Sequence, residues 1–340
     1  MASTADPTDA LSPSASPGLV LLVALPALDE EKTVGGVIRA IPRDLPGISR
    51  VEVLVVDDGS RDRTGAEAEA AGATVLRHET TQGVGAAFGA ALRHAIDIAA
   101  DVIVSIDADG QFDPADIPLL VEPVQSGRAD FASASRFKDS ALIPDMPFMK
   151  RWGNGLVARL VSRLAGQTFY DVSCGMRCYN RRAALSLNPI GRFTYTQEVF
   201  LNLAFKRLRI VEVPVAVRGE REFGESRVAS NLWRYGLNTG GIIFRCYRDY
   251  RPMLFFGSVA GVLAAIGLGL VAFLGIHYLG SGQFSPHKWA GFAGAAGLML
   301  ALLVFVTGLI GDMLNRHRIY LEELLYRERE RGARRAPRRD

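Results

Sequence analysis

The chain has 340 residues, of which 49% are hydrophobic and 22% are charged, and its formal net charge is only +3. A chain of this length and apolar fraction can bury one large core or two ordinary ones. So small a net charge says little about partners, and we expect no nucleic-acid partner.

Residues 1–17 are rich in Pro, Ser and Ala and lack the basic start and apolar core of a signal peptide, so we expect a disordered tail. A domain that mixes charged and apolar residues follows, over residues 18–229. A continuous apolar run predicts a strand at 19–25, and mostly apolar segments predict further strands at 51–56, 73–76 and 101–106. Residues 84–100 predict a helix, and further elements are expected at 130–137 (strand), 150–166 (helix) and 209–217 (strand). This alternation predicts a doubly wound, mostly parallel α/β sheet, in which ligands gather beyond the carboxyl ends of the strands.

Residues 230–252 interleave aromatic and aliphatic side chains with arginine. They predict one or two amphipathic helices at a membrane interface, although a soluble helix packed on the preceding domain fits almost as well.

Two nearly uncharged stretches follow, at 253–279 and 289–311. Each can cross about 30 Å of hydrocarbon at about 1.5 Å per residue, so both are predicted transmembrane helices. A buried soluble hairpin is the alternative, but soluble helices rarely lack a polar face for so long. Small residues at 261–269 would suit helix packing, which leaves a homo-oligomer open.

Arginines flank the two predicted spans, whereas the turn between them offers only Lys288. The positive-inside rule therefore places both termini and the preceding domain in the cytoplasm. The basic residues 312–340 are expected to form a cytoplasmic tail, which either rests on an anionic leaflet or is solvated.

Acidic residues follow three of the predicted strands: the loop that begins at Pro26, then Asp57-Asp58, then Asp107-Ala108-Asp109. Because the carboxyl ends of parallel strands share one edge of a sheet, we expect the three loops to meet. Two carboxylates one residue apart can hold Mg²⁺ or Mn²⁺ together with phosphate oxygens of a ligand. A solvated acidic turn is the alternative for any lone Asp-x-Asp. No Walker motif occurs, and "GVGAAFG" at 83–89 misses the dinucleotide spacing by one residue, so a dehydrogenase is not expected.

Eight sequence segments occur in order along the chain: "PALDEE", "VVDDGSRDRT", "DADGQFDP", "ASRF", "DVSCGMRCYNRRAA", "TQEVFL", "VEVPV" and "REFGESRV". Together they resemble the inverting family 2 glycosyltransferases, and among these the polyprenyl-phosphate group typified by dolichol-phosphate mannose synthase. The resemblance covers roughly residues 18–230. It implies a GT-A fold, a nucleotide-sugar donor, a Mg²⁺ or Mn²⁺ cofactor and a polyprenyl-phosphate acceptor in the membrane.

The resemblance also implies roles for individual residues. The expected nucleotide-sugar-binding residues are Pro26, Leu28, Glu30, Asp57, Asp107 and Ala108. The expected metal ligands are Asp109 and Gln111, and the expected catalytic residues are Asp109, Arg136, Arg221 and Arg227. Asp171 and Glu198 could also line the site, but neither is assigned a role.

Three residues depart from the family pattern. Leu28-Asp29 replace an aromatic residue and an amide in the first loop, and Arg227 stands where the family has Lys. Arginine keeps the positive charge and adds a planar fork suited to phosphate, so we expect the role to persist.

Two other functions compete with transfer to a lipid phosphate. A processive polysaccharide synthase would have the same catalytic fold, but "KRW" at 150–152 lacks the Gln of a Gln-x-x-Arg-Trp motif, and two spans are too few for a polymer channel. A catalytically silent membrane scaffold would be expected to have lost the metal-binding residues. The sequence does not identify the sugar or the polyprenol, and we favour a UDP-sugar over a GDP-sugar.

Overall fold

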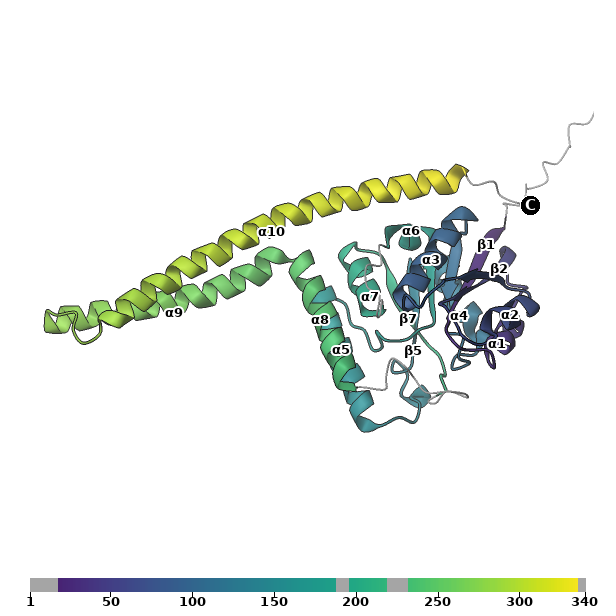
Figure 1. Cartoon of the computed structure of the whole chain (residues 1–340), viewed down its shortest axis with the longest axis horizontal. Coiled ribbons are helices and arrows are strands. Elements are labelled where there is room, and N and C mark those ends of the chain that lie inside the picture. Colours follow the sequence, from purple (N-terminus) through teal and green to yellow (C-terminus); the bar gives the residue numbers. More distant parts are fainter. Residues whose placement is uncertain (1–17, 188–195, 219–231, 336–340) are drawn as a thin grey trace, which may run out of the picture.

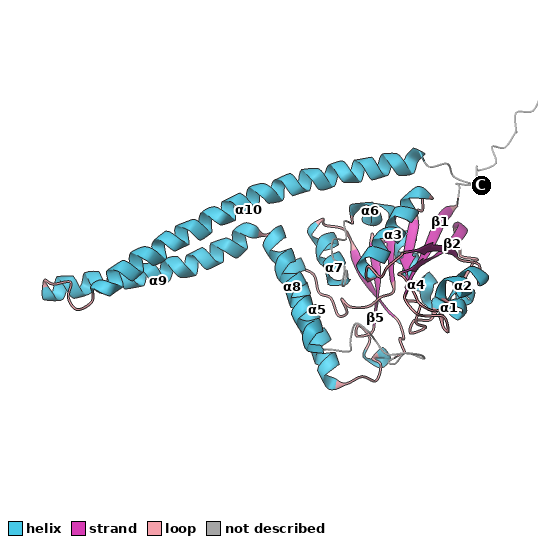
Figure 2. Ribbon diagram, viewed as in Figure 1, coloured by secondary structure: helices cyan, strands magenta, loops and turns pink. Residues whose placement is uncertain are grey.

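The computed structural model describes residues 18–187, 196–218 and 232–335. Its centre is a seven-stranded sheet with the order β3-β2-β1-β4-β6-β5-β7 (Figures 1 and 2). The strands are β1 (Leu19–Ala27), β2 (Ile48–Asp57), β3 (Thr74–Arg77), β4 (Val102–Ser105), β5 (Phe131–Ser135), β6 (Arg177–Asn180) and β7 (Ile210–Pro214). Strand β6 runs antiparallel to its neighbours β4 and β5, and all other pairs are parallel. The predicted doubly wound, mostly parallel sheet is therefore confirmed, whereas β6 was not predicted.

Helices cover both faces of the sheet, because side chains alternate between the faces along each strand. On β1, Leu21 and Val23 pack into one buried cluster, and Leu22 and Ala24 pack into the other. The first cluster is closed by α1 (Val34–Ala40), α2 (Thr64–Ala70) and α4 (Ile117–Gln125). The second is closed by α3 (Val84–Asp97), α5 (Phe148–Ala165), α6 (Arg181–Ser186) and α7 (Thr196–Phe205). Two short 3-10 helices, η1 (Pro114–Asp116) and η2 (Ser140–Leu142), complete the domain.

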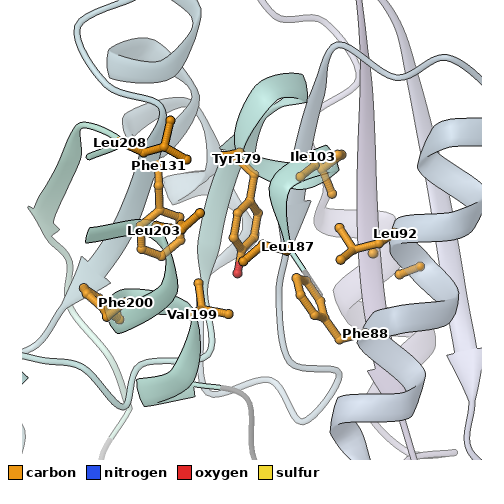
Figure 3. Close-up of a cluster of buried hydrophobic side chains, with 14 of the residues drawn as sticks. Phe88, Leu92, Ile103, Phe131, Tyr179, Leu187, Val199, Phe200, Leu203 and Leu208 are labelled. Atoms are coloured by element: carbon orange, nitrogen blue, oxygen red, sulfur yellow. The ribbon is translucent and has the colours of Figure 1, made fainter. Parts of the chain in front are cut away.

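Aromatic rings form much of the second cluster (Figure 3). The Tyr179 ring lies between two phenylalanines, with centroids 4.9 Å from Phe131 and 5.5 Å from Phe88. Phe131 in turn meets Phe200 edge-on at 5.2 Å. These contacts join β5, β6, α3 and α7, so the short strand β6 is fixed by packing more than by its own length.

Three helices follow the domain: α8 (Leu232–Tyr250), α9 (Pro252–Ser281) and α10 (Lys288–Arg335). Within the described residues, α9 and α10 are long and apolar enough to cross a membrane, and only 11% and 17% of their most apolar stretches are buried. The two helices cross closely, since a Cβ on Gly267 would lie 2.9 Å from the carbonyl oxygen of Gly294. Gly267, one of the small residues at 261–269, thus serves packing within the chain.

Helix α10 does not end where its apolar stretch ends. Residues 312–335, for which the sequence analysis expected a tail, continue the helix back alongside the domain (Figure 1). Glu322 forms an ion pair of 3.0 Å with Lys206. Arg329 donates hydrogen bonds of 3.1 and 2.8 Å to the carbonyl oxygens of Leu185 and Leu187, at the end of α6. The α9–α10 hairpin therefore begins and ends on the same domain.

Candidate functional site

The loops that follow β1 and β2 are tied together at one edge of the sheet. Asp57 is fully buried at the end of β2, where its Oδ1 accepts a 2.8 Å hydrogen bond from the Ser60 amide and its Oδ2 lies 3.6 Å from Arg77 Nε. The Asp29 amide donates to Ser60 Oγ at 3.0 Å, and Asp29 Oδ1 accepts from the Arg61 amide at 2.8 Å. These bonds fix both loops in one arrangement.

The remaining nucleotide-binding candidates of the first loop lie at the same edge. Pro26 pairs with Val56 in the strand register, one position before Asp57, and both Pro26 and Leu28 are half-buried. The Glu30 amide donates to Thr64 Oγ1 at 2.8 Å, which joins the first loop to the start of α2. The predicted meeting of the first two loops is thus found.

The third acidic loop follows β4, which is the neighbour of β1. Asp107 is half-buried, whereas Ala108 and Asp109 are each 2% exposed. Asp109 Oδ1 accepts from the Gln111 amide at 3.0 Å, and Gly110 has φ of +74°, which allows the tight turn between them. The side-chain Nε2 of Gln111 donates to the carbonyl of Arg218 at 3.3 Å, so its amide oxygen is the atom able to ligate a cation.

Arg136 follows β5, and its guanidinium is held by a buried carboxylate. Its Nε and Nη2 donate to Oδ2 and Oδ1 of Asp171 at 2.7 and 3.0 Å, and Nη2 also reaches Ser173 Oγ at 2.9 Å. The Asp171 carboxylate is buried, which by itself would raise its pKa. The adjacent charge and hydrogen bonds of Arg136 prevail and hold the pKa of Asp171 below its usual range.

The segment 171–176 brings Arg136 and the third acidic loop together. One side of it holds Arg136 through Asp171, and on the other side Gly175 lies against Asp107. A Cβ on Gly175 would come 2.1 Å from Asp107 Oδ2, so any larger residue would have to displace the Asp107 carboxylate. The wholly buried Arg177 donates a hydrogen bond of 2.8 Å to the carbonyl of Cys174 and so supports the segment. This stretch belongs to one of the eight motifs, whose sequence alone does not reveal these positioning roles.

Lys150 is a second cation near Arg136 that the sequence analysis did not single out. Burial, and then the charge of Arg136, lower the pKa of Lys150. One turn further along α5, Asn154 Oδ1 lies 3.4 Å from Ser173 Oγ, a hydroxyl that also contacts Arg136. Lys150 and Asn154 are four residues apart and share one face of α5. The sequence has no signal that separates Lys150 from the other basic residues of this helix.

Two predicted catalytic residues, Arg221 and Arg227, lie outside the described residues. Arg218, the last residue described before them, donates its amide to the carbonyl of Gln111 at 3.1 Å. Glu198 lies in the first turn of α7.

A divalent cation was predicted at Asp109 and Gln111. Across the ranges the structure describes, no group of three or more His, Cys, Asp and Glu side chains is arranged as a metal site. Two carboxylates, Asp107 and Asp109, and the Gln111 amide oxygen form a smaller set of hard oxygen donors, with Asp109 almost fully buried. Such a set fits an ion that also takes phosphate oxygens from a bound diphosphate rather than an all-protein cage.

Comparison with known proteins matches residues 22–186 to the family model described as glycosyl transferase family 2. An undecaprenyl-phosphate mannosyltransferase of Micrococcus luteus is 33% identical over 206 residues, which cover 55% of this chain and 82% of that protein. A dodecaprenyl-phosphate galacturonate synthase of Rhizobium johnstonii is 26% identical over 314 residues, covering 88% of each chain. The crystal structure of glucosyl-3-phosphoglycerate synthase from Mycobacterium tuberculosis with Mn²⁺ and UDP superposes with a TM-score of 0.54 at 25% identity, over 67% of this chain and 80% of that one. The expected GT-A fold is confirmed.

Proposed function

Because this chain belongs to glycosyltransferase family 2, we propose that it is a membrane enzyme that transfers a sugar from a nucleotide-sugar to a polyprenyl phosphate. One observation carries the proposal: the segment 171–176 holds the Arg136 guanidinium through Asp171 and lies against the acidic loop, where Gly175 meets Asp107. The names of relatives that act on undecaprenyl and dodecaprenyl phosphate support the same acceptor class.

The outer face of α5 supports a lipid acceptor. Between 43% and 75% of each of five apolar side chains on this helix is exposed: Phe148, Met149, Trp152, Leu156 and Leu160. Exposed Arg159 and Arg163 lie on the same face. A basic face with aromatic and aliphatic residues suits the surface of a membrane with anionic lipids. Helix α5 contacts α8, and α8 leads directly into α9. Both α5 and α8 run at an angle to the α9–α10 pair (Figure 1). We therefore place both α5 and α8 at the membrane surface.

This placement answers a physical requirement of the acceptor. A long isoprenoid loses about 0.8 kcal/mol for each methylene taken out of the bilayer, so the enzyme must bring its site to the lipid headgroups. The proposed arrangement has α9 and α10 crossing the membrane, with the domain and both termini in the cytoplasm. The ion pair of Glu322 with Lys206 supports it, because the chain after α10's apolar stretch returns to the domain that precedes α9.

The donor would lie at the three acidic loops. Pro26, Leu28, Glu30 and Asp57 would hold the nucleotide, and we favour UDP because the similar solved structure contains UDP. Asp107 and Ala108 would lie by the ribose and diphosphate. Asp109, Asp107 and the amide oxygen of Gln111 would hold Mg²⁺ or Mn²⁺, which when bound neutralises charge on a leaving diphosphate.

In the proposed reaction, an oxygen of the lipid phosphate forms a bond to the anomeric carbon while the bond to the diphosphate breaks, which inverts that carbon. A phosphate monoester has a second pKa of about 6 and is mostly a dianion at neutral pH, so no residue has to act as a general base. Arg136 and Lys150 would bind this dianion and orient its oxygen. Asp171 would act through Arg136, by holding the guanidinium in one orientation.

Transfer of radiolabelled sugar from a panel of UDP- and GDP-sugars to polyprenyl phosphate tests the proposal. We expect a chloroform-soluble product from one donor, lost with EDTA and restored by Mg²⁺ or Mn²⁺. Asp109→Asn should lose this activity. Asp113→Asn should retain it, because Asp113 is exposed in the same loop and caps η1, a role that Asn also fills. Nucleotide binding without a lipid product from any donor would overturn the proposal and favour the silent scaffold.

A further inference from the structure

Beyond its apolar stretch, α10 rests on α8 and on the domain with a polar face. Arg318 lies over the ring of Tyr250, with its guanidinium carbon 3.8 Å from the ring centroid. Glu322 pairs with Lys206, and Arg329 binds the carbonyl oxygens at the end of α6. The three α10 residues are separated by four and seven positions, so they lie on one side of the helix.

The other side of α10 carries a row of seven apolar residues and one histidine, hereafter the seam. Its members are Met299, Leu303, Val306, Ile310, Met313, His317, Tyr320 and Leu324. All eight are exposed, and the seven other than His317 are between 41% and 68% exposed. The intervals along the seam alternate strictly between four and three residues, which is the a/d spacing of a coiled coil sustained over roughly four heptads.

Past residue 311, α10 is oriented opposite to most helices that pack on a domain, which bury their apolar face. There the polar face contacts the domain, and the apolar face, with Met313, Tyr320 and Leu324, is exposed. Leu314 and Leu321 widen this face and are also exposed. An apolar row of this kind in water marks an interaction surface. The same row continues without a break into the stretch that would lie in the bilayer, so a partner that covered all of it would pass from the membrane into the cytoplasm.

We propose that the seam pairs α10 with α10 of a second copy of this chain, in a parallel two-stranded coiled coil. The inference rests on the proposed crossing of the membrane by α10. Two copies inserted in the same orientation bring identical heptads into register about a twofold axis. Leu303, Ile310, His317 and Leu324 occupy the a positions, and a single polar residue there, His317, fixes register and pair formation. Each domain lies on the opposite side of its own helix, so the seam is accessible to the partner.

Cysteine cross-linking of the full chain in native membranes tests the pairing. Tyr320→Cys and Leu324→Cys should each give a reducible dimer, because a disulfide needs Cα atoms about 4.4–6.8 Å apart and seam positions meet their own counterparts. Ile319→Cys is the matched control, since Ile319 is also exposed but lies on another side of the helix. We expect the cross-linked fraction at either seam position to exceed the control by about tenfold or more. Equal cross-linking at Ile319→Cys would overturn the proposed seam.

The mass of the protein in nanodiscs gives a second, independent readout. The wild type and Ile319→Glu should be dimers, and Leu324→Glu should shift to the monomer while remaining in the membrane fraction. A monomeric wild type overturns the inference. So does a Leu324→Cys variant that is protected from a soluble maleimide but does not cross-link, because lipid or another protein would then cover the face. Lipid-linked sugar formed by a monomeric wild type would show that only the pairing, and not the proposed function, has failed.

Discussion

Replacing Asp171 by Asn tests whether the buried carboxylate positions Arg136. The change keeps the shape but removes the charge that faces a guanidinium whose side chain is only 15% exposed. Removing one partner of a buried pair costs about 3–5 kcal/mol. We expect the lower end, about 3 kcal/mol, because Asn keeps one acceptor oxygen. For a domain of this size that loss corresponds to a fall in Tm of about 6–12 °C.

The same change should raise the KM for polyprenyl phosphate about tenfold, or about 1.4 kcal/mol, because the guanidinium loses its fixed orientation. The KM for the nucleotide-sugar should not change. Steady-state transfer in detergent measures both constants, and thermal unfolding followed by intrinsic fluorescence measures Tm.

Asp130→Asn is the matched control. Asp130 lies just before β5, and Arg136 lies just after it. The Asp130 carboxylate accepts hydrogen bonds of 3.0 and 3.1 Å from the Arg209 side chain, and bonds of 2.9 Å from the Arg209 amide and from Asn180 Nδ2. The Arg209 side chain is 57% exposed and can turn to water, so the loss of stability should be smaller and neither KM should change. A Tm within about 2 °C of wild type for Asp171→Asn, or equal changes of acceptor KM in both variants, would refute the positioning role.

The dependence on pH follows from the direction of the Asp171 pKa, which is lowered in the folded protein: burial alone would raise it, but the Arg136 charge outweighs that effect. The stabilisation is therefore complete above the unfolded-state pKa of about 3.9 and is lost as the pH falls through the folded value. The Tm difference between wild type and Asp171→Asn should be constant from about pH 5 to 8 and shrink below about pH 4. A difference that persists at the lowest pH would mean that packing, not charge, explains the loss.

Two further variants probe the neighbours of Arg136 and of the acidic loop. Gly175→Ala should lower kcat about tenfold or more, because its Cβ would displace the Asp107 carboxylate, whereas Gly153→Ala, which meets nothing within 4 Å, should not. Lys150→Met should raise the KM for polyprenyl phosphate about tenfold with the donor KM unchanged, while Arg151→Met, an exposed neighbour on the same helix, should leave both constants unchanged in detergent. Equal effects of Gly175→Ala and Gly153→Ala would contradict the role of Gly175. Equal effects of Lys150→Met and Arg151→Met would contradict the role of Lys150.

The sheet could be predicted because its central strands are recognisable from their sequence. Strand β1 is buried on both faces over most of its length, as is the second half of β2, and these stretches are apolar in sequence. Strand β6 has only four residues and follows an irregular segment, so neither its length nor its pattern separates it from a loop. Its place in the sheet is decided by tertiary packing, such as that of Tyr179 between two phenylalanine rings.

The acidic half of the site could also be predicted, because parallel strands bring their carboxyl ends to one edge whatever the details of packing. The cationic half could not. Asp171 is 35 residues from Arg136, and only the fold reveals that their side chains meet. Lys150 has the sequence surroundings of an ordinary surface lysine on an amphipathic helix. The seam of α10 was hidden in the same way, because the arginines that follow residue 311 indicated a tail.

Helix α5 gives a physical reason for the height of the site above the bilayer. Trp152 and Leu156 are exposed on one face, and Lys150 and Asn154 lie on the other, next to the residues that contact Arg136. A helix with its side chains is about 10–12 Å across, and an interfacial helix sinks its apolar face about 5–10 Å into the headgroup region. The two cations would then lie at the level of the lipid phosphates, so a polyprenyl phosphate could bind them with its chain still in hydrocarbon. The contacts of Glu322 and Arg329 with the domain oppose tilting about α5, which would otherwise change that height.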